Sequence, residues 1–217
     1  MIALIDYGAG NLTSVRKALT ALGADFTVPA STDVCARASG IIVPGVGHFA
    51  ATAALEGEWL QAIRSAAAAG VPLFGICLGM QWLFDGSDEA PEVQGLGVIG
   101  GRISRLENDP DRRLKVPHVG WNALDFRAAT GRAPRLFEQL TSGAQVYFTH
   151  SYAAPVTDEC VASTTHANTF SSVVERDNIF GVQFHPEKSG TAGLQIISNF
   201  LKACHQPSPA ASAGRAC

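Results

Sequence analysis

The chain lacks long hydrophobic runs and a strong net charge. None of its apolar stretches approaches the roughly 20 residues that a helix needs to span a bilayer. The first acidic residue, Asp6, comes too early for a signal peptide. The formal net charge of -3 over 217 residues gives no sign of a polyanionic partner. These absences predict a soluble protein that binds neither nucleic acid nor a membrane.

Cysteine is scarce and widely spaced. The chain has 5 cysteines and no Cys-x-x-Cys pair: Cys35, Cys77, Cys160, Cys204 and Cys217. An odd number without close spacing argues against a disulfide scaffold and against a zinc site, and it favours a reducing compartment. We therefore expect a cytoplasmic protein without a bound metal, and no motif predicts a cofactor.

The composition of the chain changes only near its end. Its hydrophobic content of 47% is sufficient for one sizeable core. Residues 1–204 are predicted to form a single domain. Residues 205–217 are rich in Ala, Ser and Pro and are predicted to be a disordered tail.

Short apolar runs alternate with amphipathic stretches in the first 84 residues. We expect strands at 2–5, 26–28, 40–43 and 71–74, and helices at 12–22, 58–69 and from residue 80. Asn11 is the expected N-cap of the first helix. This alternation predicts an α/β fold with a doubly wound parallel sheet, whose functional loops lie beyond the carboxyl ends of the strands.

Short strands and polar turns replace this alternation from about residue 85. We expect a strand at 98–103, surface connections at 108–113 and 127–135, and a glycine turn within 116–122. A strand at 145–152, a hairpin of 172–175 with 179–184, and a last helix at 191–204 complete the pattern. The sheet is therefore predicted to be mixed, mainly parallel and flavodoxin-like, with an added antiparallel region.

The sequence Gly-Ile-Cys-Leu-Gly at residues 75–79 falls between a predicted strand and a predicted helix. A nucleophile on such a sharp turn needs small residues on both sides, because side chains would crowd the turn. The helix N-terminus would also lower the pKa of a thiol placed there. Taken alone, the five residues suit a buried structural cysteine equally well.

A histidine and a carboxylate lie close together in Phe-His-Pro-Glu at residues 184–187. Residues two apart in an extended segment point to the same side, so Glu187 is expected to hold His185 in the tautomer of a general base. The alternative interpretation is a surface Pro-Glu turn.

Two glycine segments precede the cysteine. The segment Pro-Gly-Val-Gly at 44–47 allows unusual peptide orientations and is able to present N–H groups to an anion, although an ordinary tight turn has the same composition. The loop at 6–11 lacks the third glycine of a dinucleotide fingerprint, because Thr13 occupies that place. We expect this loop to approach another surface closely rather than bind phosphate.

Together these motifs resemble the class I, triad-type glutamine amidotransferases. Gly-Ile-Cys-Leu-Gly-Met-Gln at 75–81 looks like their nucleophile elbow, and Phe-His-Pro-Glu at 184–187 looks like their histidine and glutamate segment. Five further motifs resemble one subfamily, the glutaminase subunits of imidazole glycerol phosphate synthase in histidine biosynthesis: 5–12, 44–47, 116–122, 147–152 and 185–190. The likeness runs from Met1 to about Cys204, and Thr149 departs from the apolar residue expected at its position.

The resemblance implies a reaction and a set of site residues. Cys77, His185 and Glu187 would be the catalytic triad that hydrolyses glutamine to glutamate and ammonia through a γ-glutamyl thioester. The backbone of Leu78, Gly45 and Val46 would bind the oxyanion. The implied substrate-binding residues are Gly47, Gln81, His150, Ser151 and Tyr152.

The resemblance also implies a partner, the cyclase subunit of imidazole glycerol phosphate synthase, whose barrel would receive the ammonia in a heterodimer. The expected docking residues are Gly8, Gly10, Asn11, His118, Trp121 and Lys188. In the alternative interpretation, Trp121 is a core residue and Lys188 is simply solvated. We further expect the isolated subunit to be nearly inactive until the partner favours one orientation of the 44–47 segment.

Three other functions stay open at this point. The first is the glutaminase of another synthase, for example in pyridoxal phosphate synthesis. The second is a cysteine peptidase or stress-type hydrolase on a similar fold, and the third is a binding subunit with a relic triad. Ammonia release from glutamine, co-purification of the partner and the reactivity of the Cys77 thiol distinguish these functions.

Overall fold

The computed structural model describes residues 1–111, 113–127 and 133–205. The predicted tail from residue 206 onward, Arg112 of the predicted 108–113 connection and residues 128–132 of the predicted 127–135 connection lie outside the described residues.

One large sheet organises the described part of the chain. Its strand order is β2-β1-β3-β4-β14-β13-β12-β9. The bounds are β1 Ile2–Leu4, β2 Phe26–Thr27, β3 Gly40–Val43, β4 Leu73–Ile76, β9 Asp125–Phe126, β12 Cys160–His166, β13 Asn168–Arg176 and β14 Ile179–Val182. The strands from β2 to β14 pair in parallel, and those from β14 to β9 pair antiparallel. The predicted mixed α/β fold is confirmed.

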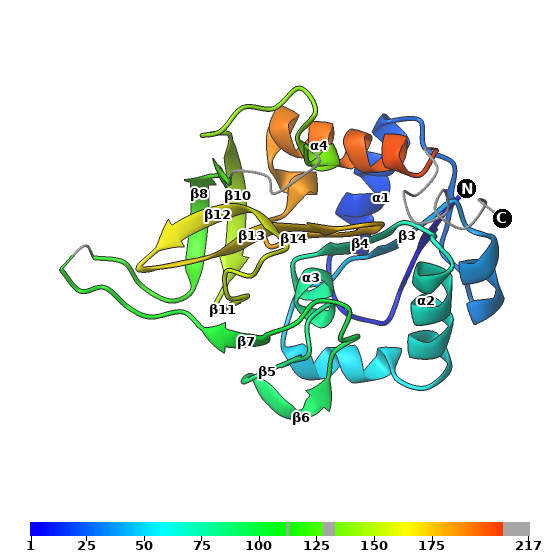
Figure 1. Ribbon diagram of the computed structural model, residues 1–217, viewed down its shortest axis with the longest axis horizontal. Helices are drawn as coiled ribbons and strands as arrows, with labels where there is room; N and C mark the ends of the chain where they lie inside the picture. Colours follow the sequence, from blue (N-terminus) through cyan, green and yellow to red (C-terminus); the bar gives the residue numbers. More distant parts are fainter. Residues whose placement is uncertain (112, 128–132, 206–217) are drawn as a thin grey trace, which may run out of the picture.

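Helices cover both faces of this sheet. Helices α1 (Leu12–Ala21) and α4 (Gly190–Ala203) lie on one side, and α2 (Glu58–Ala68) and α3 (Leu78–Trp82) lie on the other (Figure 1). Successive strand residues point to opposite faces. Accordingly Phe74 packs in the cluster beneath α1 and α4, whereas its neighbour Leu73 packs in the cluster beneath α2. The residues of β1, β3 and β4 are buried on both faces, which explains the continuous apolar runs of these strands.

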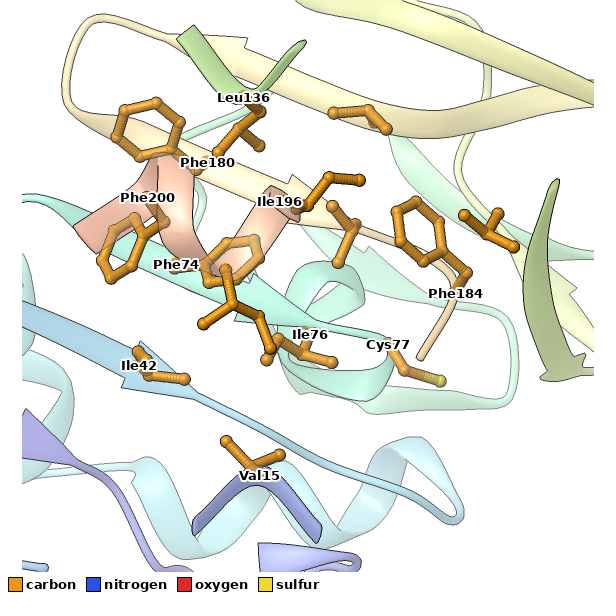
Figure 2. Close-up of a cluster of buried hydrophobic side chains, with 14 of the residues drawn as sticks. Val15, Ile42, Phe74, Ile76, Cys77, Leu136, Phe180, Phe184, Ile196 and Phe200 are labelled. Carbon is orange, nitrogen blue, oxygen red and sulfur yellow. The ribbon is translucent and has the colours of Figure 1, made fainter. Parts of the chain in front are cut away.

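The cluster between the sheet and α4 is aromatic. The rings of Phe74 and Phe200 stack with their centroids 4.9 Å apart, and the ring of Phe180 meets that of Phe200 edge-on at 5.7 Å. Figure 2 shows that Cys77 lies at the end of this cluster, where β4 stops, with Phe184 nearby. The end of β4 that carries Cys77 is therefore anchored on the packed core.

Two smaller sheets carry the rest of the described strands. One pairs β8 (His118–Ala123) with β10 (Gln145–His150), antiparallel. The other has the order β11-β7-β5-β6, with bounds Tyr152–Ala153, Arg102–Arg105, Gly86–Ser87 and Ala90–Gln94. Short 3₁₀ segments at Thr32–Arg37, Phe49–Leu55, Arg135–Phe137 and Pro186–Lys188 are η1 to η4.

Two predicted elements are wrong in detail. Only the end of the predicted 98–103 strand is extended in a sheet, because the N–H groups of Val98 and Ile99 instead donate to the Leu83 carbonyl at 3.0 and 3.1 Å and cap the end of α3. The predicted glycine turn in 116–122 is strand β8, in which Gly120 has a φ of 138°.

Candidate functional site

Cys77 occupies the turn between β4 and α3. Its φ of 53° lies in the left-handed region, which is uncommon for a residue with a side chain. The N–H of Cys77 donates to the Val182 carbonyl at 2.7 Å, and its own carbonyl accepts from the N–H of Gln81 at 3.1 Å. These bonds hold the strained residue between the neighbouring strand and the first turn of the helix.

The two flanking glycines make this turn possible. A Cβ at Gly79 would overlap the Val43 carbonyl oxygen, and one at Gly75 would come within 2.7 Å of the Cα of Met80. Hydrogen at both positions therefore lets α3 approach β3 and β4 closely. This packing agrees with the predicted need for small residues on both sides of Cys77.

His185 and Glu187 form a buried pair. The distance between His185 Nδ1 and Glu187 Oε1 is 2.9 Å, and both side chains are 1% exposed. The predicted contact is present, but Glu187 reaches the imidazole from the 3₁₀ turn η4 rather than from an extended segment. His185 Nε2 and Glu187 Oε2 have no hydrogen-bond partner. One imidazole nitrogen is thus held, and the other is free to exchange a proton.

The surroundings of His185 favour its protonated form. Burial alone would lower the pKa of His185, but Cys77 and Glu187 together outweigh burial and raise that pKa to about 10. Cys77 acts through its proximity, because no partner lies within hydrogen-bond distance of Nε2. The histidine is therefore an imidazolium at neutral pH.

Asn11 contacts this pair from a different part of the chain. Its Nδ2 donates to Glu187 Oε1 at 2.9 Å, and its side chain makes no capping bond to α1. Asn11 occupies the predicted N-cap position, but the predicted side-chain cap is wrong, since this side chain contacts Glu187 instead. The loop before α1 is thereby tied to the carboxylate beside His185.

The 44–47 segment lies across the elbow. The N–H of Leu78 points to the Gly45 carbonyl at 3.4 Å, a long hydrogen bond. The buried hydroxyl of Tyr7 lies against Gly45 and has no hydrogen-bond partner. Burial, with the nearby Cys77, raises the pKa of Tyr7. In this conformation the carbonyl, not the N–H of Val46, faces the N–H of Leu78.

A cavity of about 190 Å³ opens beside Cys77. It is smaller than the roughly 300–1,000 Å³ of pockets for drug-sized ligands, so it suits a molecule of amino-acid size. Predicted site residues in its lining are Val46, Gly47, Cys77, Leu78, Gln81, His150, Ser151 and Tyr152. The described residues that line a larger hollow of about 540 Å³ beside α4 include neither cysteine nor histidine.

Three cavity residues were missed by the sequence analysis: Glu89, Pro117 and Thr149. Glu89 is the one carboxylate among the described lining residues, and its Oε2 accepts the N–H of Phe49 at 2.8 Å. Its sequence context, a run of acidic and small residues, gives no signal. The sequence marks Thr149 only as a departure from the family pattern.

Buried amides connect the cavity to the cysteine. Gln81 Nε2 donates to the Tyr152 carbonyl at 2.8 Å and to Gln183 Oε1 at 3.1 Å. Gln183 Nε2 approaches Cys77 Sγ at 3.7 Å. Gln183 was also missed by the sequence analysis, because an amide in an apolar strand end carries no motif.

The predicted docking residues divide into two groups. Gly8, Gly10 and Lys188 are exposed, Asn11 is partly buried, and Trp121 is 57% exposed, so Trp121 is not a core residue. His118 is only 4% exposed. The structure places His118 in the interior behind β8, because its ring stacks on Phe148 and His166.

Within the described ranges, no helix combines the length and apolarity needed to cross a membrane.

Residues 3–204 match the protein family described as glutamine amidotransferase class-I. The chain belongs to this family. Membership agrees with the mixed sheet and confirms the predicted enzyme class, a glutamine amidotransferase.

Curated relatives narrow the similarity further. The chain is 46% identical over 203 residues to the imidazole glycerol phosphate synthase subunit HisH of Moorella thermoacetica, covering 92% of this chain and 93% of the relative. It is 46% identical over 208 residues to the protein of the same name from Geobacillus thermodenitrificans, covering 93% and 95%. The one from Gloeobacter violaceus is 42% identical over 219 residues, covering 99% and 94%. The predicted subfamily is confirmed, because these relatives are named as subunits of imidazole glycerol phosphate synthase.

Solved structures share the fold at low identity. A crystal structure of a glutamine amidotransferase superposes with a TM-score of 0.69 at 17% identity, covering 94% of this chain and 99% of that one. A chain in the structure of PurLQS from Thermotoga maritima superposes with a TM-score of 0.65 at 18% identity, covering 93% and 97%. At such low sequence identities, these structures show only that the fold is shared.

Proposed function

We propose that this chain is the glutaminase subunit of an imidazole glycerol phosphate synthase and supplies ammonia for histidine biosynthesis. The observation that carries the proposal is a strained, glycine-flanked Cys77 that lines a cavity and lies close enough to the buried pair of His185 and Glu187 to raise the pKa of His185, although the pair is not among the described residues that line the cavity. The HisH relatives supply the particular synthase.

In the proposed reaction, the Cys77 thiolate attacks the side-chain amide carbon of glutamine. The carbon–nitrogen bond breaks as the imidazolium of His185 donates its proton to the leaving nitrogen, and ammonia departs. The product is a γ-glutamyl thioester on Cys77. The partnerless Nε2 of His185 is the nitrogen available for this transfer.

Water then attacks the thioester carbon, and His185, now neutral, takes a proton from it. The carbon–sulfur bond breaks, so glutamate leaves and the thiolate returns. Glu187 holds Nδ1 at 2.9 Å throughout and stabilises the imidazolium. Asn11 supports the same carboxylate oxygen.

The oxyanion is proposed to bind the N–H groups of Leu78 and Val46. In the present conformation the Gly45 carbonyl occupies the N–H of Leu78 at 3.4 Å, so the Gly45–Val46 peptide must turn before both N–H groups are available. One lost oxyanion donor typically costs about 2.7–4 kcal/mol of transition-state stabilisation. The isolated chain is therefore expected to be slow until the turned state is favoured.

Glutamine itself is proposed to lie in the 190 Å³ cavity. Glu89 offers a carboxylate for the α-ammonium group of the substrate, since its Oε2 is held by the N–H of Phe49. Gln81 and the backbone of Gly47, His150, Ser151 and Tyr152 would complete the substrate contacts.

The proposed partner is the cyclase subunit, in a heterodimer located in the cytoplasm. Val119 and Trp121 on β8 are exposed by 56% and 57%, an apolar pair suited to a protein interface. Gly8, Gly10, Asn11 and Lys188 belong to the same proposed docking surface, and His118 supports it from behind.

The test is the release of ammonia and glutamate from glutamine by this chain, first alone and then with the cyclase subunit plus its nucleotide ligand. We expect low activity alone and a strong rise on mixing. High activity alone would contradict the gating by the 44–47 segment. Activity in neither case would contradict the proposed partner or substrate.

The Cys77→Ser variant tests the thioester. We expect it to lose activity while its far-ultraviolet spectrum and its affinity for the cyclase are unchanged, because the substitution changes one atom. Full glutaminase activity in this variant would contradict the covalent mechanism.

A further inference from the structure

Three buried histidines lie together: His118 on β8, His150 on β10 and His166 on β12. The ring of His118 stacks on that of His166 at 4.2 Å between centroids, and His118 Nδ1 lies 3.1 Å from His150 Nε2. Among the described residues no group of three or more His, Cys, Asp or Glu is arranged to hold a metal ion. The nitrogen–nitrogen contact of His118 with His150 must therefore be explained by a hydrogen bond.

The polarity of this bond is fixed from one end by Tyr152. The carbonyl of Tyr152 lies 2.9 Å from His150 Nδ1 and is only able to accept, so His150 carries its proton on Nδ1. In the neutral imidazole its Nε2 is then an acceptor. His118 Nδ1 must donate to it.

The hydrogen bonds of Asn122, at the other end of this chain, assign the same tautomer to His118. Asn122 Nδ2 donates to the Thr165 carbonyl at 3.1 Å, and Asn122 Oδ1 accepts the N–H of Ala123 at 2.8 Å, which fixes the amide orientation. Asn122 Nδ2 also faces His118 Nε2 at 3.4 Å, as a donor. His118 Nε2 therefore accepts, and both histidines are Nδ1–H tautomers.

A second proton on either ring would find no acceptor among these partners. Burial is the largest influence and lowers the pKa of His118 to about 4, with the His166 ring acting in the same direction. Burial likewise lowers the pKa of His150 to about 3, and neighbouring His118, His166 and His185 add to this effect while the Tyr152 carbonyl opposes it. Both rings are neutral at physiological pH.

The chain of hydrogen bonds ends in the cavity described above. The Tyr152 carbonyl accepts from His150 and also from Gln81 Nε2 at 2.8 Å, and His150, Tyr152 and Gln81 all line the cavity. A single carbonyl thus anchors two side chains of the cavity wall.

We infer that His118 is a positioning residue for the glutamine pocket: as an Nδ1–H donor it orients His150, which fixes the Tyr152 carbonyl and through it Gln81. The inference rests on the proposed function, since it takes glutamine to be the occupant. His118 touches no reacting atom and acts only through His150.

The first experiment measures tautomers directly. Nitrogen-15 NMR of the histidines in the full chain should show Nδ1 protonated and Nε2 unprotonated for both His118 and His150 at pH 7. A His118 with its proton on Nε2 would overturn the inference. This measurement needs neither catalysis nor a variant, so it stands even if the proposed substrate is wrong.

The second experiment measures steady-state kinetics for glutamine in the complex with the cyclase subunit plus its ligand. His118→Phe keeps a stacking ring and removes the donor, so we expect KM to rise about three- to tenfold with a smaller change in kcat. His118→Asn retains an N–H near the Nδ1 position and should restore much of the loss. An unchanged KM in His118→Phe would overturn the positioning role.

His166→Phe is the matched control. His166 stacks on the same ring, but its Nε2 lies 2.9 Å from the Lys115 carbonyl and has no bond to His150. It should leave KM unchanged, and an equal rise in both variants would contradict the inference. If His118→Phe fails to fold, a wild-type KM in His118→Asn with a wild-type His150 tautomer supports the inference, and a raised KM with that tautomer contradicts it. A wild-type complex that releases no glutamate would instead reject the proposed function.

Discussion

Replacement of Glu187 by glutamine removes the charge that faces His185 while keeping the shape of the side chain. Both side chains are 1% exposed, and the contact between Nδ1 and Oε1 is 2.9 Å, so solvent screens the pair little. Hydrogen bonds to charged groups contribute about 1.5–3 kcal/mol. We expect the Glu187→Gln change to lower the pKa of His185 by about one to two, since one unit corresponds to about 1.4 kcal/mol.

This change in pKa has a defined effect on the pH dependence of stability. The pKa of His185 is raised from 6.5 to about 10 in the folded chain. The stabilisation from the proton is therefore complete below pH 6.5 and is lost as the pH rises from 6.5 to 10. The cost of burying the carboxylate is the same across this window and cancels from the slope. The free energy of unfolding of the variant should consequently fall less steeply as the pH rises.

Urea denaturation of both proteins between pH 6 and pH 10 measures the effect. The difference in the free energy of unfolding should be largest, by about 1.5–3 kcal/mol relative to pH 10, at the acid end of the window. Titratable groups that do not influence His185 occur in both proteins and cancel, whereas Cys77 interacts with His185 in both and is part of the measured difference. Glu89→Gln is the control, because Glu89 lies in the cavity without contacting His185.

Equal pH slopes for the wild type and Glu187→Gln would refute the reasoning. That result would mean that Cys77, the stronger of the two influences that raise the pKa of His185, holds the proton alone. The role of Glu187 would then be limited to orientation of the ring.

Two further changes test the framework of the site. Asn11→Ala removes the amide from Glu187 Oε1 and should lower kcat/KM for glutamine about tenfold in the complex with the cyclase, whereas an unchanged value would make the contact incidental. Gly79→Ala drives a Cβ into the Val43 carbonyl oxygen and should destabilise the fold by about 1–3 kcal/mol in urea unfolding. Gly100→Ala, where a Cβ meets no atom within 4 Å, is its control, and equal effects would contradict the packing argument.

Local patterns in the sequence predict most of the large sheet. Strands β1, β3 and β4 are continuous apolar runs because helices cover both their faces. The stretch at 98–103 also contains apolar residues, yet Val98 and Ile99 lie against the end of α3 and use their N–H groups to cap it. The apolar composition of a segment predicts that the segment is buried. It does not predict whether its backbone pairs with a strand or with the end of a helix.

The residues of the candidate site are likewise predictable only in part from local sequence. Cys77 and the His185–Glu187 pair are each visible as local motifs, but their meeting depends on β14 entering the sheet beside β4, with Val182 opposite Ile76. This pairing brings together residues far apart in the sequence, and periodicity carries no information on it. Gln183 and Glu89 were missed for the same reason, since their roles arise only where separate elements converge.

Strand β8 explains why His118 is buried while Trp121, predicted for the same docking surface, is exposed. Alternation along a strand puts His118 on the face opposite Val119, and the usual expectation would bury the apolar residues Val119 and Trp121. The structure has the reverse, with the histidine inside and the apolar pair exposed. Hydrogen bonds to both nitrogens lower the cost of burying an imidazole, and His150 and Asn122 provide them for His118. An inverted strand of this kind leaves apolar side chains uncovered in the isolated chain, which supports the proposal that a partner covers them.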